Sequence, residues 1–169
     1  AWWKVLNFAI NEHRTDVEIV IAQHQWPTWG NQNIINYLSD QRDLFKFIHD
    51  RTLNLVNKGL TMNEIAETLT LPPGLSQEWY NRGYYGSVSH NSKAVYQRYM
   101  GWYDSNPADL NPLPPVEAAK KYVEFMGGED QVLTNAKKSI AAGEYRWAAE
   151  VLKHVVFADP KNQTARDLQ

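Results

Sequence analysis

The sequence predicts a mainly α-helical fold preceded by a short helix–strand piece. Apolar residues recur with a period near 3.6 residues after Gly30, whereas residues 17–22 form a short β-branched run. With 169 residues, 43% of them hydrophobic and 21% charged, the chain has the composition of a globular protein and the length of one domain or two small ones. A net charge of −2 argues against nucleic-acid binding, and no apolar run is long enough to span a membrane.

The first thirty residues are expected to form half of an α/β unit. Residues 2–12 carry apolar side chains at helical spacing, and the following VEIVIA run at residues 17–22 is apolar on both faces, as in a buried strand. One strand cannot form a sheet, so the rest of the sheet is missing, is paired by a partner, or the segment is not a strand. Both ends of the sequence resemble interrupted helices, and we therefore expect a fragment of a longer protein.

A long helix and a short helix are expected next. The periodic apolar residues run from Ile34 to Val56, and Gly59 can end this helix as a C-cap. Thr61 and Glu64 have the spacing of a capping box, which predicts a second helix that begins there and continues to about residue 69.

The middle of the chain is expected to contain two further helices and then a long loop. A short helix is predicted from Ser76 to about residue 82, followed by an irregular Gly- and Tyr-rich segment. Ser89 or Asn91 can cap the next helix. Residues 104–115 contain four prolines and two asparagines, which predicts an extended loop and the main organisational boundary.

Three helices are predicted near residues 115–126, 128–142 and 144–158. The last two have small residues and a closing Pro160 at the offsets of one tetratricopeptide-like hairpin. Because one repeat buries little apolar surface by itself, this hairpin is expected to pack on its neighbours or on another chain.

His24 begins the most distinctive segment, HQWPTWG, directly after the predicted strand. A histidine presented at a strand end can act as a metal ligand or as an acid–base group. The alternative is that the aromatic residues pack and His24 is an ordinary hydrogen-bonded polar residue. No second histidine or carboxylate lies at ligand spacing, and the chain has no cysteine, so a complete metal site cannot be built locally.

A second polar segment spans residues 84–93, YYGSVSHNSK, around a predicted helix start. The free N–H groups and the positive dipole end of a helix favour a bound anion. Arg82 and Lys93 would add positive charge. The alternative is a capped helix start with solvated cations.

Five segments in chain order resemble the alkylsulfatases of the metallo-β-lactamase superfamily, which are zinc-dependent type III sulfatases. The resemblance is carried by HQWPTWG at 24–30, QRDLFKFIHD at 41–50, YNRGYYGSVSHN at 80–91, KAVYQRY at 93–99 and NPLPPVEAA at 111–119. It extends over nearly the whole chain.

The resemblance implies two domains. Residues 1–30 would be the C-terminal edge of an αββα metallo-β-lactamase-like catalytic domain, and residues 31–169 a helical alkyl sulfatase dimerisation domain, split by the loop near 104–115. It also implies a homodimer and a binuclear Zn²⁺ site whose ligands lie mostly outside this chain. The location of the protein is undetermined from this sequence, although the resemblance suggests a periplasmic or secreted enzyme.

The resemblance implies roles for individual residues as well. His24 would be a zinc ligand, with Gln25 standing where relatives commonly have a second histidine. Relatives often have arginine where Lys93 stands, and lysine lacks the bidentate fork of arginine. The residues expected to bind the sulfate group are His90, Asn91, Lys93, Arg82 and Tyr85.

The function implied is hydrolysis of linear alkyl sulfate esters to alcohol and sulfate by a zinc-activated hydroxide. The alkyl tail would lie along an aromatic residue such as Trp79 or Trp102. The fragment itself is expected to be inactive because it holds one metal ligand. The alternative is a non-enzymatic helical dimerisation or protein-interaction module, whose aromatic residues form its core and interface.

Overall fold

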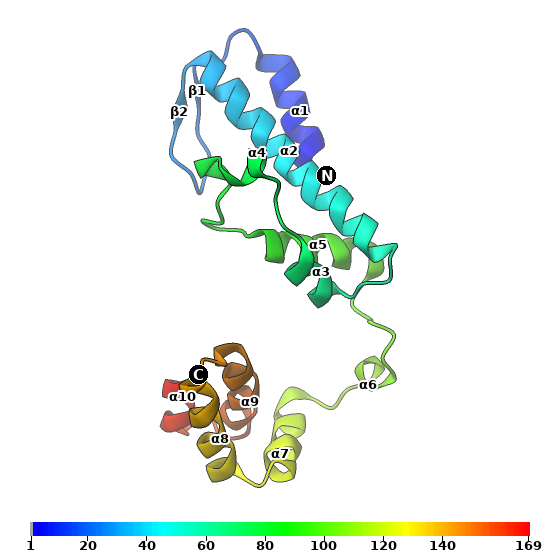
Figure 1. Ribbon diagram of the computed structural model, residues 1–169, viewed down its shortest axis with the longest axis vertical. Coiled ribbons are helices and arrows are strands. Elements are labelled where there is room, and N and C mark those ends of the chain that lie inside the picture. The colour runs from blue at the N-terminus through cyan, green and yellow to red at the C-terminus, as the bar shows by residue number, and fades with distance from the viewer. Residues whose placement is uncertain (1) are drawn as a thin grey trace. The chain divides into compact units, whose positions relative to one another are not determined.

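The chain divides into two compact units in a computed structural model that describes Trp2–Gln169. The first unit is Ala1–Asp104 and the second is Ser105–Gln169. The division falls at the start of the Pro-rich segment in which the sequence places its main boundary. Helices dominate both units, and the described residues contain one small two-stranded sheet (Figure 1). The mainly α fold class is therefore confirmed.

The first unit begins with the expected helix, α1 (Trp2–His13), and a short β-hairpin. Strand β1 (Ile19–Val20) pairs antiparallel with β2 (Thr28–Trp29). The prediction of a buried strand was wrong, because Ile19 is 45% exposed and Ile21 is 72% exposed. Within residues 2–169, β1 pairs with β2 along one edge, and this small sheet leaves the side chains of Ile19 and Ile21 exposed.

Helix α2 (Asn31–Val56) is the long helix that the periodicity predicts, and α1 packs along it (Figure 1). Most of its buried residues are spaced three or four positions apart, as expected for a helix with one buried face. The contact between α1 and α2 is centred on the buried side chains of Ile10, Ile34, Tyr37 and Leu38.

The segment after α2 contains short helices. Helix α3 (Met62–Thr68) begins with the predicted capping box, in which Thr61 and Glu64 bond to each other's backbone N–H groups. The helix predicted from Ser76 to about residue 82 was wrong. It is replaced by α4 (Pro73–Ser76) and the 3₁₀ helix η1 (Trp79–Asn81), because proline is favoured in a first helical turn and so starts the helix earlier.

Helix α5 (Val88–Met100) closes the first unit and packs on α2 and α3. Its cap is neither Ser89 nor Asn91. The hydroxyl of Ser87 accepts a hydrogen bond from the His90 backbone N–H at 3.2 Å, so the cap lies two residues before the first expected one.

The second unit contains the three predicted helices and two that were not predicted. The expected loop holds the short helix α6 (Pro107–Leu110), and α10 (Gln163–Leu168) follows Pro160. The predicted helices are α7 (Pro115–Phe125), α8 (Glu129–Ala141) and α9 (Tyr145–Ala158). Helix α9 packs on α7, α8 and α10. The tetratricopeptide-like character of the α8–α9 hairpin stays a prediction. Among residues 2–169, no helix has the length and apolar character needed to cross a lipid bilayer.

Candidate functional site

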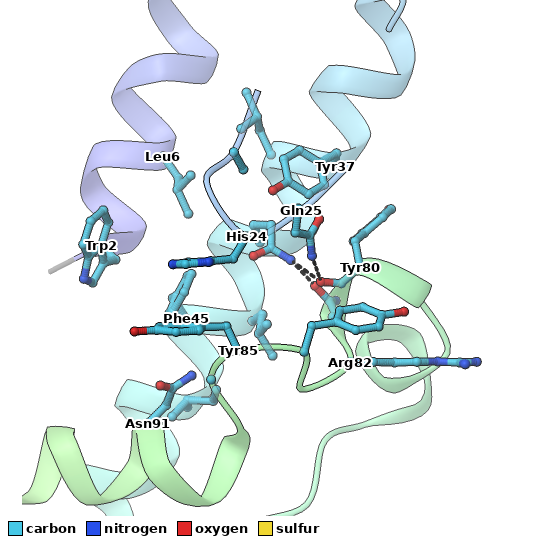
Figure 2. Close-up of a pocket in the computed structure, with 18 of the residues that line it drawn as sticks. Trp2, Leu6, His24, Gln25, Tyr37, Phe45, Tyr80, Arg82, Tyr85 and Asn91 are labelled. Carbon is cyan, nitrogen blue, oxygen red and sulfur yellow. Dashed lines mark hydrogen bonds between the residues drawn. The ribbon is translucent and has the colours of Figure 1, made fainter. Parts of the chain in front are cut away.

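A pocket of about 560 Å³ lies in the first unit, where the β1–β2 loop meets α1, α2 and the segment that leads into α5 (Figure 2). Its wall is mostly apolar, with side chains such as Leu6, Leu38 and Phe45. The polar groups around it come from three places in the chain: the loop after β1, helix α2, and residues 80–91. Large apolar pockets with a few converging polar groups are the usual form of ligand sites.

His24 lies on the turn between β1 and β2 and reaches this pocket. Its imidazole stacks on the phenol ring of Tyr85, with ring centroids 3.9 Å apart and an interplanar angle of 6° (Figure 2). The two residues are 61 positions apart in the sequence. The stack fixes the plane of the imidazole, while the ring nitrogens make no hydrogen bond within residues 2–169 and are available to a ligand.

Gln25 anchors the loop that carries His24. Its side-chain Nε2 donates to the backbone carbonyl of Tyr80 at 2.6 Å, and the Nε2 of Gln41 donates to the same carbonyl at 3.1 Å. Gln41 also donates to Oδ1 of Asn81 at 2.6 Å. These partly buried bonds join the β1–β2 loop, α2 and η1 in one network.

One atom of Gln25 lacks a partner. Its buried Oε1 accepts no hydrogen bond from the residues that the structure describes. A buried acceptor without a donor carries a desolvation cost, so the geometry of this network is obtained at some expense in stability.

Tyr80 is held at its hydroxyl as well as at its backbone. The hydroxyl donates to Oδ2 of Asp40 at 2.5 Å, and the ring contacts Tyr37 edge to face at 5.2 Å. Burial raises the pKa of Tyr80 far above its usual value, and the hydrogen bond to the Asp40 carboxylate raises that pKa further. The phenol therefore remains a protonated donor at physiological pH.

Asn91 reaches the pocket from the first turn of α5. Gly86 leaves room for this amide, because a Cβ at position 86 would lie 3.2 Å from Oδ1 of Asn91 and would make it shift slightly. Arg82 also lines the pocket, although its guanidinium points away from His24 (Figure 2).

The structure thus brings four of the six predicted site residues to one pocket: His24, Arg82, Tyr85 and Asn91. His90 and Lys93 do not line it. On α5, His90 lies one position before Asn91 and Lys93 lies two positions after it. Both therefore point to other faces of the helix than Asn91 does. The imidazole of His90 is exposed and its Nδ1 lies 3.1 Å from the hydroxyl of Ser87. The roles of all six residues remain predictions.

Sequence reasoning missed the amide network. Gln41 belongs to a Gln-Arg-Asp cluster that resembles a solvated helix face. The signal that identifies it is its register on α2. It lies three positions after Leu38 and three before Leu44, on the face that is otherwise buried and apolar.

A smaller hollow of about 350 Å³ adjoins His24 and Gln25 on the side of Trp26, Trp79 and Tyr84. Trp102, the other tryptophan considered for an alkyl chain, lines neither pocket. Within residues 2–169, no three His, Asp or Glu side chains are placed to hold a metal ion together.

Comparison with known proteins identifies relatives along the whole chain. This chain is 56% identical over 167 residues to alkyl/aryl-sulfatase BDS1 of Saccharomyces cerevisiae. The alignment covers 99% of this chain and 26% of that protein. The chain is 51% identical to an (R)-specific secondary-alkylsulfatase of Pseudomonas sp., covering 100% of this chain and 26% of the relative. The chain thus spans about a quarter of the length of these relatives.

A solved structure has the same fold. The chain matches the stereoselective inverting sec-alkylsulfatase Pisa1 from Pseudomonas sp. with a TM-score of 0.90 and 50% sequence identity, covering 99% of this chain and 27% of that one. The family model described as alkyl sulfatase dimerisation matches residues 61–169, which is more than half of the chain. The chain therefore belongs to the alkyl sulfatase dimerisation family.

Proposed function

We propose that this chain is part of an alkyl sulfatase, a sulfuric ester hydrolase that converts linear alkyl sulfate esters to an alcohol and sulfate. The relatives named alkylsulfatases, with more than 50% identity along the chain, support the class of reaction. The observation that carries the proposal is the pocket in which the imidazole of His24, stacked on Tyr85, meets the start of α5 and Asn91.

His24 is the one zinc ligand that this chain contributes in our proposal. Its ring is oriented by Tyr85, and its loop is tied to Tyr80 through Gln25. The remaining ligands would come from a longer protein of which this chain is about a quarter by comparison with its relatives. A bound binuclear zinc site of the metallo-β-lactamase type would supply an activated hydroxide for attack on the ester.

The sulfate group would be bound by donors at the start of α5. The side-chain amide of Asn91 faces the pocket, and a helix N-terminus carries a partial positive charge that suits an anion. Arg82 would add its charge after its side chain turns toward the pocket. His90 and Lys93 act less directly in this arrangement because they lie outside the pocket lining.

The alkyl chain would lie on the apolar wall of the same region. Trp79 is better placed than Trp102 for this role, because Trp79 lines the smaller hollow next to His24. Apolar contact of this kind contributes about 0.8 kcal/mol for each buried methylene.

The working form would be a homodimer, for which the dimerisation family of residues 61–169 gives support.

Replacement of His24 tests the proposal in the intact protein that contains this sequence. We expect His24→Ala to lower the bound zinc and to reduce kcat/KM for an alkyl sulfate by more than about 100-fold, since loss of a residue that merely supports a metal ligand already costs about 10–100-fold. Zinc is counted by mass spectrometry and turnover by sulfate release. His13→Ala, an exposed histidine in the same unit, is the matched control and should change neither. Normal zinc content and turnover in His24→Ala would refute the assignment, and a dimer without hydrolysis in the unmodified protein would favour the interaction module.

A further inference from the structure

The loop between β1 and β2, which carries His24, has little support of its own. Each of the two strands is only two residues long, and His24 is exposed to solvent. A backbone hydrogen bond of 3.4 Å, from the nitrogen of Gln25 to the carbonyl oxygen of Ala22, closes the turn. Because two-stranded hairpins are marginally stable by themselves in water, the orientation of the imidazole depends on contacts with other parts of the chain.

The segment 80–85 supplies these contacts. The backbone carbonyl of Tyr80 accepts the 2.6 Å hydrogen bond from Nε2 of Gln25. Five positions later, the ring of Tyr85 stacks on the imidazole of His24 with centroids 3.9 Å apart (Figure 2). His24 and Gln25 are adjacent in the chain, so a movement of this segment would disturb both contacts at once.

Helix α2 holds this segment in place at Tyr80 and Asn81. The hydroxyl of Tyr80 donates to Oδ2 of Asp40 at 2.5 Å, and its ring meets Tyr37 edge to face at 5.2 Å. Oδ1 of Asn81 accepts a hydrogen bond from Nε2 of Gln41 at 2.6 Å. Among these contacts the bond to Asp40 is the one with a charged partner, and such bonds are about twice as strong as those between neutral groups.

We propose that Asp40 and Tyr80 are positioning residues for His24. The bond between the carboxylate and the phenol fixes the Tyr80 side chain on α2, and this fixes the direction of the Tyr80 carbonyl. The carbonyl in turn orients Gln25 and the imidazole beside it. Asp40 does not line the pocket, so it would act on a bound zinc only through this series of contacts. The inference rests on the proposed zinc role of His24 and names the residues that keep this ligand aligned.

Replacement of Tyr80 by phenylalanine in the intact protein that contains this sequence tests the proposal. Tyr80→Phe removes the hydroxyl and keeps both the ring and the main-chain carbonyl. It is a cleaner change than loss of Asp40, because, besides burial and Asp40, Glu78 also raises the pKa of Tyr80 and would remain as a nearby carboxylate. Asp40→Asn serves as the conservative variant, since the amide oxygen of asparagine can still accept the hydrogen bond.

Two measurements separate positioning of the loop from general stability. Hydrogen exchange at saturating zinc reports on the His24 loop, and competition with a chelator gives the zinc Kd. We expect Tyr80→Phe to speed the exchange of residues 22–27 about 5-fold, as for loss of one hydrogen bond, and to raise the zinc Kd about 10-fold. Asp40→Asn should lie between the unmodified protein and Tyr80→Phe in both measurements.

Tyr96→Phe is the matched control, because it removes the same hydroxyl from another tyrosine of the first unit. Tyr96 packs against the apolar cluster that contains Ile65, and it lines neither pocket that contains His24. Both the loop exchange and the zinc Kd should therefore be unchanged. The exchange of α3 in every variant shows whether the whole unit has been destabilised.

The outcomes distinguish this inference from the proposed function. An unchanged zinc Kd in Tyr80→Phe overturns the inference, whether or not the loop exchanges faster. Exchange that speeds equally in α3 and in residues 22–27 also overturns it, because the pair then stabilises the unit without positioning the loop. Either result leaves the zinc role of His24 intact. A normal zinc content in His24→Ala contradicts that role itself, and the inference falls with it.

Discussion

The two units of the chain are held together by different kinds of contact. The second unit closes around small apolar side chains, and four alanines, Ala119, Ala136, Ala148 and Ala165, are each at most 2% exposed. Small side chains let helix axes approach closely, so this unit depends on close apolar packing. The first unit buries larger isoleucine and leucine side chains in its core, but around the pocket it relies on the side-chain amides of Gln25, Gln41 and Asn81.

The two kinds of contact differ in how precisely they position individual atoms. Apolar packing is non-directional, so it stabilises the second unit without fixing any single atom for chemistry. Hydrogen bonds between partly buried amides and carbonyls are directional and contribute only about 0.5–1.5 kcal/mol each. In the first unit these hydrogen bonds position the His24 loop, although each adds little to the overall stability. Three changes test this contrast.

The largest effect is expected from Leu152→Ala. Leu152 is completely buried on α9, and removing three of its carbons leaves a cavity between close-packed helices. We expect the free energy of unfolding of the second unit to fall by about 2–5 kcal/mol. Hydrogen exchange of α7, α8 and α9 in increasing urea measures it. The control is Leu110→Ala, the same change at a side chain that is 58% exposed, which should cost much less.

A smaller effect on stability is expected from Gln41→Leu, which removes the donor to the Tyr80 carbonyl and to Asn81. We expect a loss of about 1–3 kcal/mol in the first unit, because Oδ1 of Asn81 is left buried without a donor. The same variant should speed hydrogen exchange in the His24 loop. Gln32→Leu is the matched control, since Gln32 is exposed on the same helix. Two results for Gln41→Leu would contradict this difference between the units. One is a fall in the free energy of unfolding larger than that of Leu152→Ala, and the other is unchanged hydrogen exchange in the His24 loop.

The smallest effect is expected from pH, through His154. Burial lowers the pKa of this imidazole, and the neighbouring charge of Lys153 lowers it further. The folded state therefore prefers the neutral ring, and its contribution to stability is complete above the ordinary pKa of about 6.5 and is lost as the pH falls through the folded value. Between pH 7.5 and 5 we expect the Tm of the second unit to fall slightly more than in His154→Gln, at fixed protein concentration. An identical pH profile in the two proteins would show that this ring does not contribute.

Local features of the fold could be predicted from the sequence, and features that join distant segments could not. The Thr61–Glu64 capping box lies within four residues, so its spacing was sufficient to predict it. The start of α5 was harder because residues 87–91 offer several capping side chains, of which Ser87 is the one that caps the helix. The burial of β1 was overestimated because a β-branched run shows what a strand can bury but not what covers it.

In the candidate site, too, residues could be identified from local sequence, whereas contacts between distant segments could not. His24 and the polar segment before α5 were identified from their residue types, and the structure places them around one pocket. The stack of His24 on Tyr85 and the bond from Gln25 to Tyr80 each join residues more than fifty positions apart. No local pattern specifies such pairs, since they depend on how the η1 segment returns to α2. The register that excludes His90 and Lys93 from the pocket likewise depends on where α5 begins.

The bond from Gln25 ends on a main-chain oxygen, and this has a consequence for how the protein can vary. Every amino acid supplies that carbonyl, so a change of side chain at position 80 preserves the acceptor. A carbonyl oxygen has two lone pairs, and the amides of Gln25 and Gln41 occupy both. As far as this acceptor is concerned, position 80 can therefore tolerate more substitutions than the two glutamines can. The hydrogen bond from the Tyr80 hydroxyl to Asp40 is the separate constraint on the side chain at that position.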